Sequence, residues 1–241
     1  MSRRSMPLLI AGGLALALVL LAVVWHNSSS HQTAMQATNV QHAAAGVSTV
    51  ELDGINGSLT VGVGNSAQIS ATAQPANGHS APALVLKLNA ATHVLTLICP
   101  NSNGGSAATC PASTYAVLVP AHVGVTLHEV SGQAVLTGLS GPISITAASA
   151  DTSAQGLLTT DFSAAITSGT LNASFATAPT HVSVTVISAQ ASLQFPASAS
   201  YDVRQKSVSA DIQVNIPQSS TSVHTVQVSA TSGEINLGTG N

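Results

Sequence analysis

The chain has 241 residues, of which 5% are charged and 2% aromatic, and its formal net charge is −3 at pH 7. Large aromatic cores and ion-pair networks are therefore excluded, so small and β-branched residues must pack regularly on pleated surfaces instead. Nucleic-acid binding is also excluded, because it requires clustered Lys and Arg, whereas only Lys87, Arg204 and Lys206 follow Arg4.

The apolar segment 7–25 contains no charged side chain and predicts a transmembrane helix. A helix of this length would span roughly 28 Å, close to the thickness of the bilayer hydrocarbon core. Arg3 and Arg4 precede the segment, so the positive-inside rule places residues 1–6 in the cytoplasm and the remainder outside. A cleaved signal peptide is the alternative, although its apolar region is usually shorter. We therefore expect a single-pass protein of the cell membrane with an extracytoplasmic C-terminal domain.

Residues 26–46 show no strand alternation and are interpreted as a flexible polar stalk. Alternation of apolar and polar residues begins near Val47, so the extracytoplasmic domain is predicted to cover 47–241. Within it, the segment 84–99 is typical of a hairpin with its turn at 89–92.

Six short segments in the second half of the chain repeat one pattern: a small pair followed by an alternating strand. Their first residues are Ser131, Ser149, Ser168, Ser188, Ser209 and Ser232, spaced by 18 to 23 residues. This period predicts an all-β fold, a β-solenoid or β-helix of short strands, each repeat holding two or three strands of about four to six residues. An antiparallel sandwich with coincidental spacing is the alternative.

The stacked repeats should align equivalent positions in ladders along the stack. The expected apolar ladder is Val135, Leu171, Ser192 or Leu193, Ile212 and Ile235. A small residue follows each repeat serine, which fits a tight corner where a side chain would clash or a positive φ is needed.

Several of these segments together resemble a known family: INGSLTV at 55–61, SGQAV at 131–135, GLSGPISI at 138–145, SADIQV at 209–214 and TSGEINL at 231–237. They are similar to the bacterial "putative adhesin" domains of unknown function, with head-GIN-like β-solenoid repeats. The resemblance covers 47–241, most strongly 115–241, and departs where motif Gly and Asp are replaced by Ala, Gln or Thr. It implies surface interaction or adhesion and supplies no catalytic residues.

Cys99 and Cys110 are the two cysteines of the chain. Because both would lie in an oxidising compartment, we expect a disulfide between them. It would close a loop of about 12 residues and stabilise the fold by roughly 2–3 kcal/mol. Metal binding or a catalytic thiol is the alternative, but neither has a nearby His or second Cys pair to support it.

Acidic residues occupy the same place in three repeats, two residues after the repeat serine: Asp151, Asp211 and Glu234. Asp211 and Glu234 would be about 5 Å apart on adjacent turns, with Asp151 three turns from Asp211, and such a pair could hold Ca²⁺. Gln133, Thr170 and Gln190 interrupt this ladder, which favours a solvated turn position instead. We therefore predict no metal site and no cofactor.

No motif indicates catalysis. The histidines lack metal-ligand spacing, and neither a nucleophile elbow nor a phosphate-binding loop occurs. A polysaccharide-active β-helix enzyme would need convergent carboxylates, whereas the eight acidic residues are dispersed. The sequence therefore predicts no catalytic residue and a non-enzymatic, membrane-anchored surface-interaction or adhesion protein. Its partner would be a cell-envelope polymer or protein, and an envelope-stress sensor or assembly scaffold is the alternative role.

Overall fold

The computed structural model describes residues 37–75, 80–100 and 109–240. The predicted cytoplasmic segment 1–6 and transmembrane helix 7–25 lie outside these residues. Nowhere in the described ranges is there a helix long and apolar enough to cross a membrane. Residues Gln36–Asn241 form one compact unit, and the description below concerns this unit alone.

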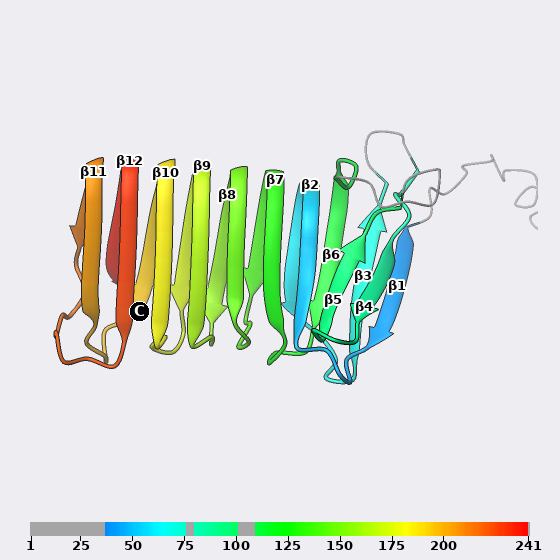
Figure 1. The fold of residues 1–241 in the computed structure, drawn as a ribbon, viewed down its shortest axis with the longest axis horizontal. Coiled ribbons are helices and arrows are strands. Elements are labelled where there is room, and N and C mark those ends of the chain that lie inside the picture. The colour runs from blue at the N-terminus through cyan, green and yellow to red at the C-terminus, as the bar shows by residue number, and fades with distance from the viewer. Residues whose placement is uncertain (1–36, 76–79, 101–108, 241) are drawn as a thin grey trace, which may run out of the picture. The chain divides into compact units, whose positions relative to one another are not determined.

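The compact unit is built from twelve β-strands (Figure 1). They are β1 (Thr38–Ala43), β2 (Thr49–Val63), β3 (Gln68–Gln74), β4 (Val85–Asn89), β5 (Val94–Ile98), β6 (Ser113–Val119), β7 (Gly124–Thr137), β8 (Ile143–Leu157), β9 (Asp161–Phe175), β10 (His181–Pro196), β11 (Asp202–Val214) and β12 (Thr225–Gly240). The predicted all-β class is therefore confirmed for the described residues. The hairpin expected within 84–99 is present as β4 and β5, which pair antiparallel.

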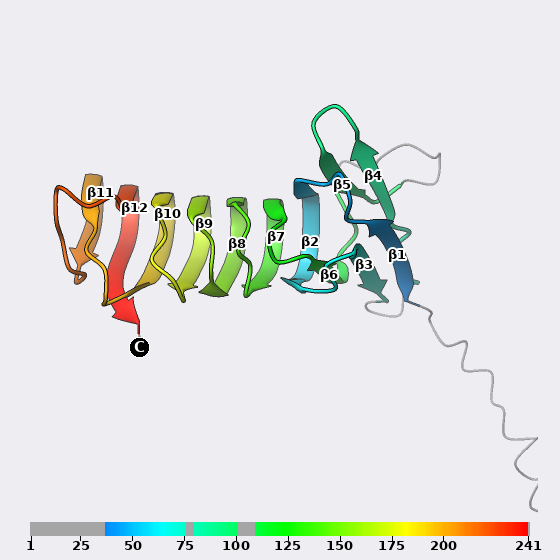
Figure 2. The same ribbon diagram turned by 90° about the horizontal axis from the view of Figure 1, so that it is seen from below.

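Each repeat is one long strand that bends at its middle, so the prediction of several short strands per repeat is wrong. In Figures 1 and 2 each long strand turns back on itself, giving a first arm before the repeat serine and a second arm after it. In β10, buried and exposed residues alternate along both arms, and two exposed residues in succession, Ile187 and Ser188, mark the bend. The bend shifts the alternation by one residue while the backbone stays extended, so both arms turn their apolar side inward.

The six repeat serines lie side by side at the bends, as their spacing predicts. Parallel pairing joins Ser131 to Ser149 and Ser149 to Ser168. Ser188 pairs with both Ser168 and Ser232, and Ser232 pairs in turn with Ser209.

The order of strands in the stack differs from their order in the chain. Strand β12 lies between β10 and β11, so the last strand of the chain fills an interior position and β11 forms the end of the stack. The predicted separation of three turns between Asp151 and Asp211 requires consecutive stacking, which is therefore wrong at this end. At the other end, β5 and β6 pair with the first and second arms of β2, so these two strands form the outermost turn there.

The residue after each repeat serine alternates between Gly and Ala along the stack. In spatial order these residues are Gly132, Ala150, Gly169, Ala189, Gly233 and Ala210. A Cβ on Gly169 would lie 2.1 Å from the carbonyl oxygen of Ala150, and one on Gly233 would lie 2.1 Å from that of Ala189. Both glycines have positive φ, so every second bend excludes a side chain.

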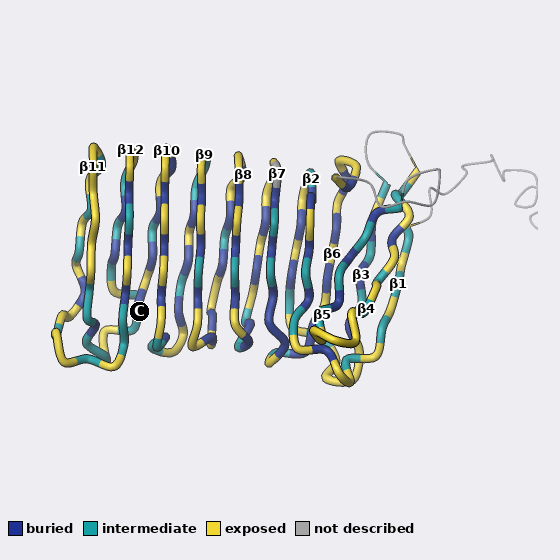
Figure 3. Tube along the Cα trace, in the orientation of Figure 1, coloured by how far each residue is buried: buried dark blue, intermediate teal, exposed yellow. Residues whose placement is uncertain are grey.

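A continuous core fills the space between the two arms (Figure 3). The ladder of inward residues just after the bends includes Leu171, Ile235 and Ile212, as predicted. Val135 and Ser192 were also expected there but occupy outward positions; Ala134 and Ala191 are buried instead. The alternative to Ser192, Leu193, is buried but pairs with Leu237 in the next inward ladder. The inward position is the third residue after each repeat serine, whereas Val135 and Ser192 are the fourth residue after Ser131 and Ser188.

Antiparallel strands cover the β5–β6 end of the stack. Strand β4 pairs with β5, β3 pairs with β6, and β1 pairs with β3. Strand β1 lies within 26–46, so the interpretation of this whole segment as a stalk is wrong and the folded domain begins before residue 47. Its residues alternate only between half-buried and exposed, because an edge strand buries little of either face and needs few apolar residues.

Candidate functional site

The outer faces of the two arms carry parallel rows of polar side chains. On the first arms, strand register places Thr126, Ser144, Ser163, Ser183 and Gln227 in one row across β7, β8, β9, β10 and β12. Neighbouring members of such a row are about 4.8 Å apart, because this is the spacing of paired strands. These five members are uncharged hydrogen-bonding groups at regular intervals, and the same register continues to Glu51 on β2 and Arg204 on β11.

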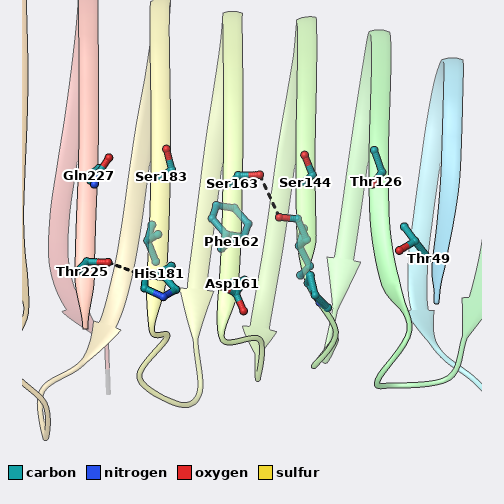
Figure 4. A pocket seen from close by; sticks show the side chains of 13 residues that line it. Thr49, Thr126, Ser144, Asp161, Phe162, Ser163, His181, Ser183, Thr225 and Gln227 are labelled. Carbon is teal, nitrogen blue, oxygen red and sulfur yellow. Dashed lines mark hydrogen bonds between the residues drawn. The ribbon is translucent and has the colours of Figure 1, made fainter. Parts of the chain in front are cut away.

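A shallow groove of about 410 Å³ runs along this row from β2 to β12. Figure 4 shows the hydroxyl groups along the groove, with Asp161, His181 and Thr225 at one side of the row. These three residues follow one another in register on β9, β10 and β12.

The polar groups at this side of the groove are held by hydrogen bonds of ordinary length. His181 Nδ1 lies 2.9 Å from Thr225 Oγ1, and the Thr160 hydroxyl donates to Asp161 Oδ2 at 2.8 Å. No hydrogen bond joins His181 to Asp161 among the contacts of the described residues. The trio therefore lacks the linked nucleophile, base and orienting carboxylate of a catalytic triad, and the groove is suited to binding through hydrogen bonds.

The acidic residues of the repeats lie on the outer face of the second arms. Asp211 and Glu234 are adjacent in register, as predicted. Asp151 is three strands from Glu234 and four from Asp211, rather than three turns from Asp211, because β12 precedes β11 in the stack.

Each of these carboxylates accepts a hydrogen bond from a neutral side chain. The donors are Thr170 to Asp151 at 2.8 Å, Asn236 to Glu234 at 2.7 Å and Gln213 to Asp211 at 3.0 Å. Across the described ranges, no group of three or more His, Cys, Asp or Glu side chains could hold a metal ion.

Cys99 and Cys110 are joined by a disulfide, with their Cα atoms 5.3 Å apart. The bridge lies where the outermost turn would bend, since β5 pairs with the first arm of β2 and β6 with the second. The backbone N–H of Cys110 donates to the carbonyl of Gly54 at 2.8 Å, and the Asn56 side chain donates to the carbonyl of Cys110 at 3.1 Å. The disulfide therefore replaces a continuous bend and has a structural role.

Sequence reasoning missed one unusual group, the carboxyl of Glu129. This residue is 3% exposed and lies on β7 between Ile55 of β2 and Ala147 of β8. Neither carboxyl oxygen has a hydrogen-bond partner among the described groups. Burial, and secondarily the negative charge of Asp151, raises the pKa of Glu129 to about 7.

The signal for this residue was present in the alternation of β7. Val125, Leu127 and Glu129 occupy successive inward positions, so the two-residue period already placed Glu129 in the core. Its partner in register on β8, Ala147, is small and occupies less of the core than a Leu or Ile would.

Comparison with protein families identifies the repeat region. Residues 131–238 match the family model described as Toastrack DUF4097. The resemblance to an adhesin-like domain of unknown function that the sequence suggested is thereby confirmed for this part of the chain. No curated protein matches the chain.

Three solved structures show a more distant likeness. A protein described as a putative cell adhesion protein from Clostridium sporogenes has 11% identity and a TM-score of 0.43, the match covering 85% of this chain and 100% of that protein. Putative adhesins from Parabacteroides distasonis and Parabacteroides merdae have 10% identity each and TM-scores of 0.27 and 0.28. Each match covers 83% of this chain, and 97% and 96% of the respective structures.

Proposed function

We propose that this chain is a membrane-anchored, extracytoplasmic and non-enzymatic interaction protein that binds a neutral polyhydroxylated polymer of the cell envelope. The observation that carries this proposal is the groove on the first arms, in which one row of hydroxyl and amide groups crosses consecutive strands. Segment 7–25 would supply the anchor.

The chemistry of the row favours an uncharged partner. Among the described residues that line the groove, Asp161 is the one acidic and His181 the one imidazole side chain, and none is Lys or Arg. An anionic polymer would gain little Coulomb attraction there, whereas sugar hydroxyls can exchange hydrogen bonds with each Ser, Thr and Gln in turn. A polymer lying along the stack would meet equivalent groups about every 4.8 Å.

The proposal can be tested with the compact unit Gln36–Asn241, which has its own hydrophobic core. We expect this fragment to co-sediment with insoluble cell-wall glycan prepared from a bacterial envelope and freed of protein. Ser144→Leu combined with Ser163→Leu fills the centre of the groove with apolar side chains and should weaken retention at least about tenfold, since the hydrogen bonds of both hydroxyl groups are lost together.

The matched control is Ser153→Leu combined with Asn172→Leu, which places the same two leucine side chains on the outer face of the second arms of β8 and β9. Retention of the control at the level of the unmodified fragment would locate binding in the groove. Equal retention of both double variants, or no retention of the unmodified fragment, would contradict the proposal.

A further inference from the structure

The β11 end of the stack presents an uncovered strand edge. Among the described strands, β11 pairs with β12 alone. Three of its inward residues, Val203, Ile212 and Val214, are only half-buried, whereas their partners on β12, Val226, Ile235 and Leu237, are fully buried. Two further inward residues of the first arm, Gln205 and Ser207, are polar and exposed. The core of the stack is therefore open to solvent along β11.

Exposed apolar side chains are also concentrated at this end. Val208, at the bend of β11, is 72% exposed, and Val223, in the loop between β11 and β12, is 74% exposed. These are the highest values among the exposed large hydrophobic residues of the described part of the chain. Figures 1 and 2 place the loop beside β11, at the end of the stack. We define the end face as β11 together with residues 215–224.

The charges of β11 are divided between its two arms. Arg204 and Lys206 lie on the first arm and Asp211 lies on the second, all three exposed. Arg204 is occupied by an ion pair with Asp202 at 2.8 Å, whereas Lys206 has no ion-pair partner among the described residues. Lys206 is two residues before Val208 and Asp211 is two residues after Ser209, so both are equally distant from the bend.

This arrangement is self-complementary under two-fold symmetry. Consider a two-fold axis that lies in the end face, passes through the bend and runs between the two arms, perpendicular to the direction of stacking. It would place the first arm of one copy antiparallel to the second arm of the other. Lys206 would then face Asp211 of the second copy, and Arg204 would face Gln213. The outer faces of both copies would stay outward, as an isologous interface requires. Inside, Val203 would face Val214 and Ile212 would face Gln205 of the second copy.

We propose that the end face binds the end face of a second copy of this chain, giving a symmetric end-to-end dimer. Lysines on an edge strand often serve only to prevent association, but that role does not need an Asp at the mirrored position. The base of the edge is already covered, since Tyr201 pairs with Gln218, so the contact is centred on the bend and on Val208. This proposal is independent of the groove on the first arms.

The test is the mass in solution of Gln36–Asn241, measured by sedimentation over a range of concentrations. We expect a monomer–dimer equilibrium that Lys206→Asp and Asp211→Lys each weaken at least about tenfold, because each creates two like-charge contacts across the axis. The double variant Lys206→Asp with Asp211→Lys restores opposite charges and should recover the dimer. Lys87→Asp, on β4 at the other end, is the matched control and should leave the equilibrium unchanged.

Cysteine substitution provides a second measurement. Lys206→Cys with Asp211→Cys should form disulfide-linked dimers on mild oxidation, because the two positions face each other only between copies. The control is Lys206→Cys with Gln190→Cys. It places the second cysteine at the equivalent second-arm position of β10, a strand in the interior of the stack, and should not form disulfide-linked dimers. A monomer at all concentrations, or a dimer that neither charge reversal weakens, would overturn the proposal.

Discussion

The two ends of the stack differ in how their outermost turn is covered. At the β5–β6 end, the outermost turn is built from two strands joined by a disulfide, and antiparallel β1, β3 and β4 extend its edges. At the β11 end, the outermost turn is one continuous strand that is exposed along most of its length. Stacked repeats expose apolar surface at both termini unless a different structure covers them. The comparison indicates that the first end is closed within the chain and the second is available for association.

The largest effect is expected where the covered end joins the repeats. Gly132 has φ of +131°, and a Cβ there would lie 2.0 Å from the carbonyl oxygen of Gly57. Gly132→Ala should therefore separate β7 from β2 at the bend and reduce the free energy of unfolding by about 3 kcal/mol or more. Gly156→Ala is the control, since Gly156 also has positive φ but has open space around it, and about 1 kcal/mol is expected. Equal losses in urea titrations would show that the contact is unimportant.

The second effect concerns the buried carboxyl near the covered end. The folded-state pKa of Glu129, about 7, lies above the ordinary value of 4.5. The folded state therefore binds this proton more tightly, and stability is greatest below pH 4.5, falls as the pH rises to about 7 and then levels off. The loss should be about 2–3 kcal/mol between pH 4.5 and pH 8.

Glu129→Gln removes this ionisation and should stabilise the protein at pH 8. Denaturant unfolding at several pH values measures both effects. Glu234→Gln, which alters a half-exposed carboxyl on β12, serves as the control. It should leave unchanged the decrease in stability with rising pH that is due to Glu129. A Glu129→Gln variant with unchanged pH dependence would show that the carboxyl finds a partner in solution.

The disulfide comes third in expected magnitude and acts on the covered end alone. Replacing both Cys99 and Cys110 by Ala should cost roughly 2–3 kcal/mol, because the open loop gains entropy in the unfolded state. Hydrogen exchange should increase in β5 and β6 but not in β11. A uniform increase along the stack would mean that the two ends unfold as one cooperative unit.

The smallest loss of stability is expected for a substitution of Ile212, at the open end. Ile212 of β11 and Ile235 of β12 are neighbours in one ladder, but Ile212 is half-buried and Ile235 fully buried. At low protein concentration, Ile212→Ala should cost about 1 kcal/mol and Ile235→Ala about 3 kcal/mol. Thermal unfolding of both variants checks this difference. Similar losses would indicate that β11 is covered even in the isolated chain.

The repeats were predicted well from the sequence, whereas the two ends of the stack were predicted poorly. The spacing of the repeat serines placed all six bends in register, and Leu171, Ile212 and Ile235 were assigned correctly to the core. Strand β1 was missed because an edge strand needs little apolar alternation. The groove could not be foreseen, since its residues come from six strands and meet only through strand pairing.

One tertiary feature left a trace in the sequence that was overlooked. In chain order, the residues after the repeat serines run Gly132, Ala150, Gly169, Ala189, Ala210 and Gly233, so the alternation fails at the last two. It is restored when β12 precedes β11, as the structure has it.

The sequence by itself determined that this protein is a stack of strands and where each strand bends, because period and alternation are properties of the chain alone. Only the tertiary structure decided which strand lies beside which, since strands with nearly equal repeats can pair with several neighbours. At the bends, that choice depends on the clash between a Cβ and a neighbouring carbonyl oxygen, which exists only once the strands are stacked.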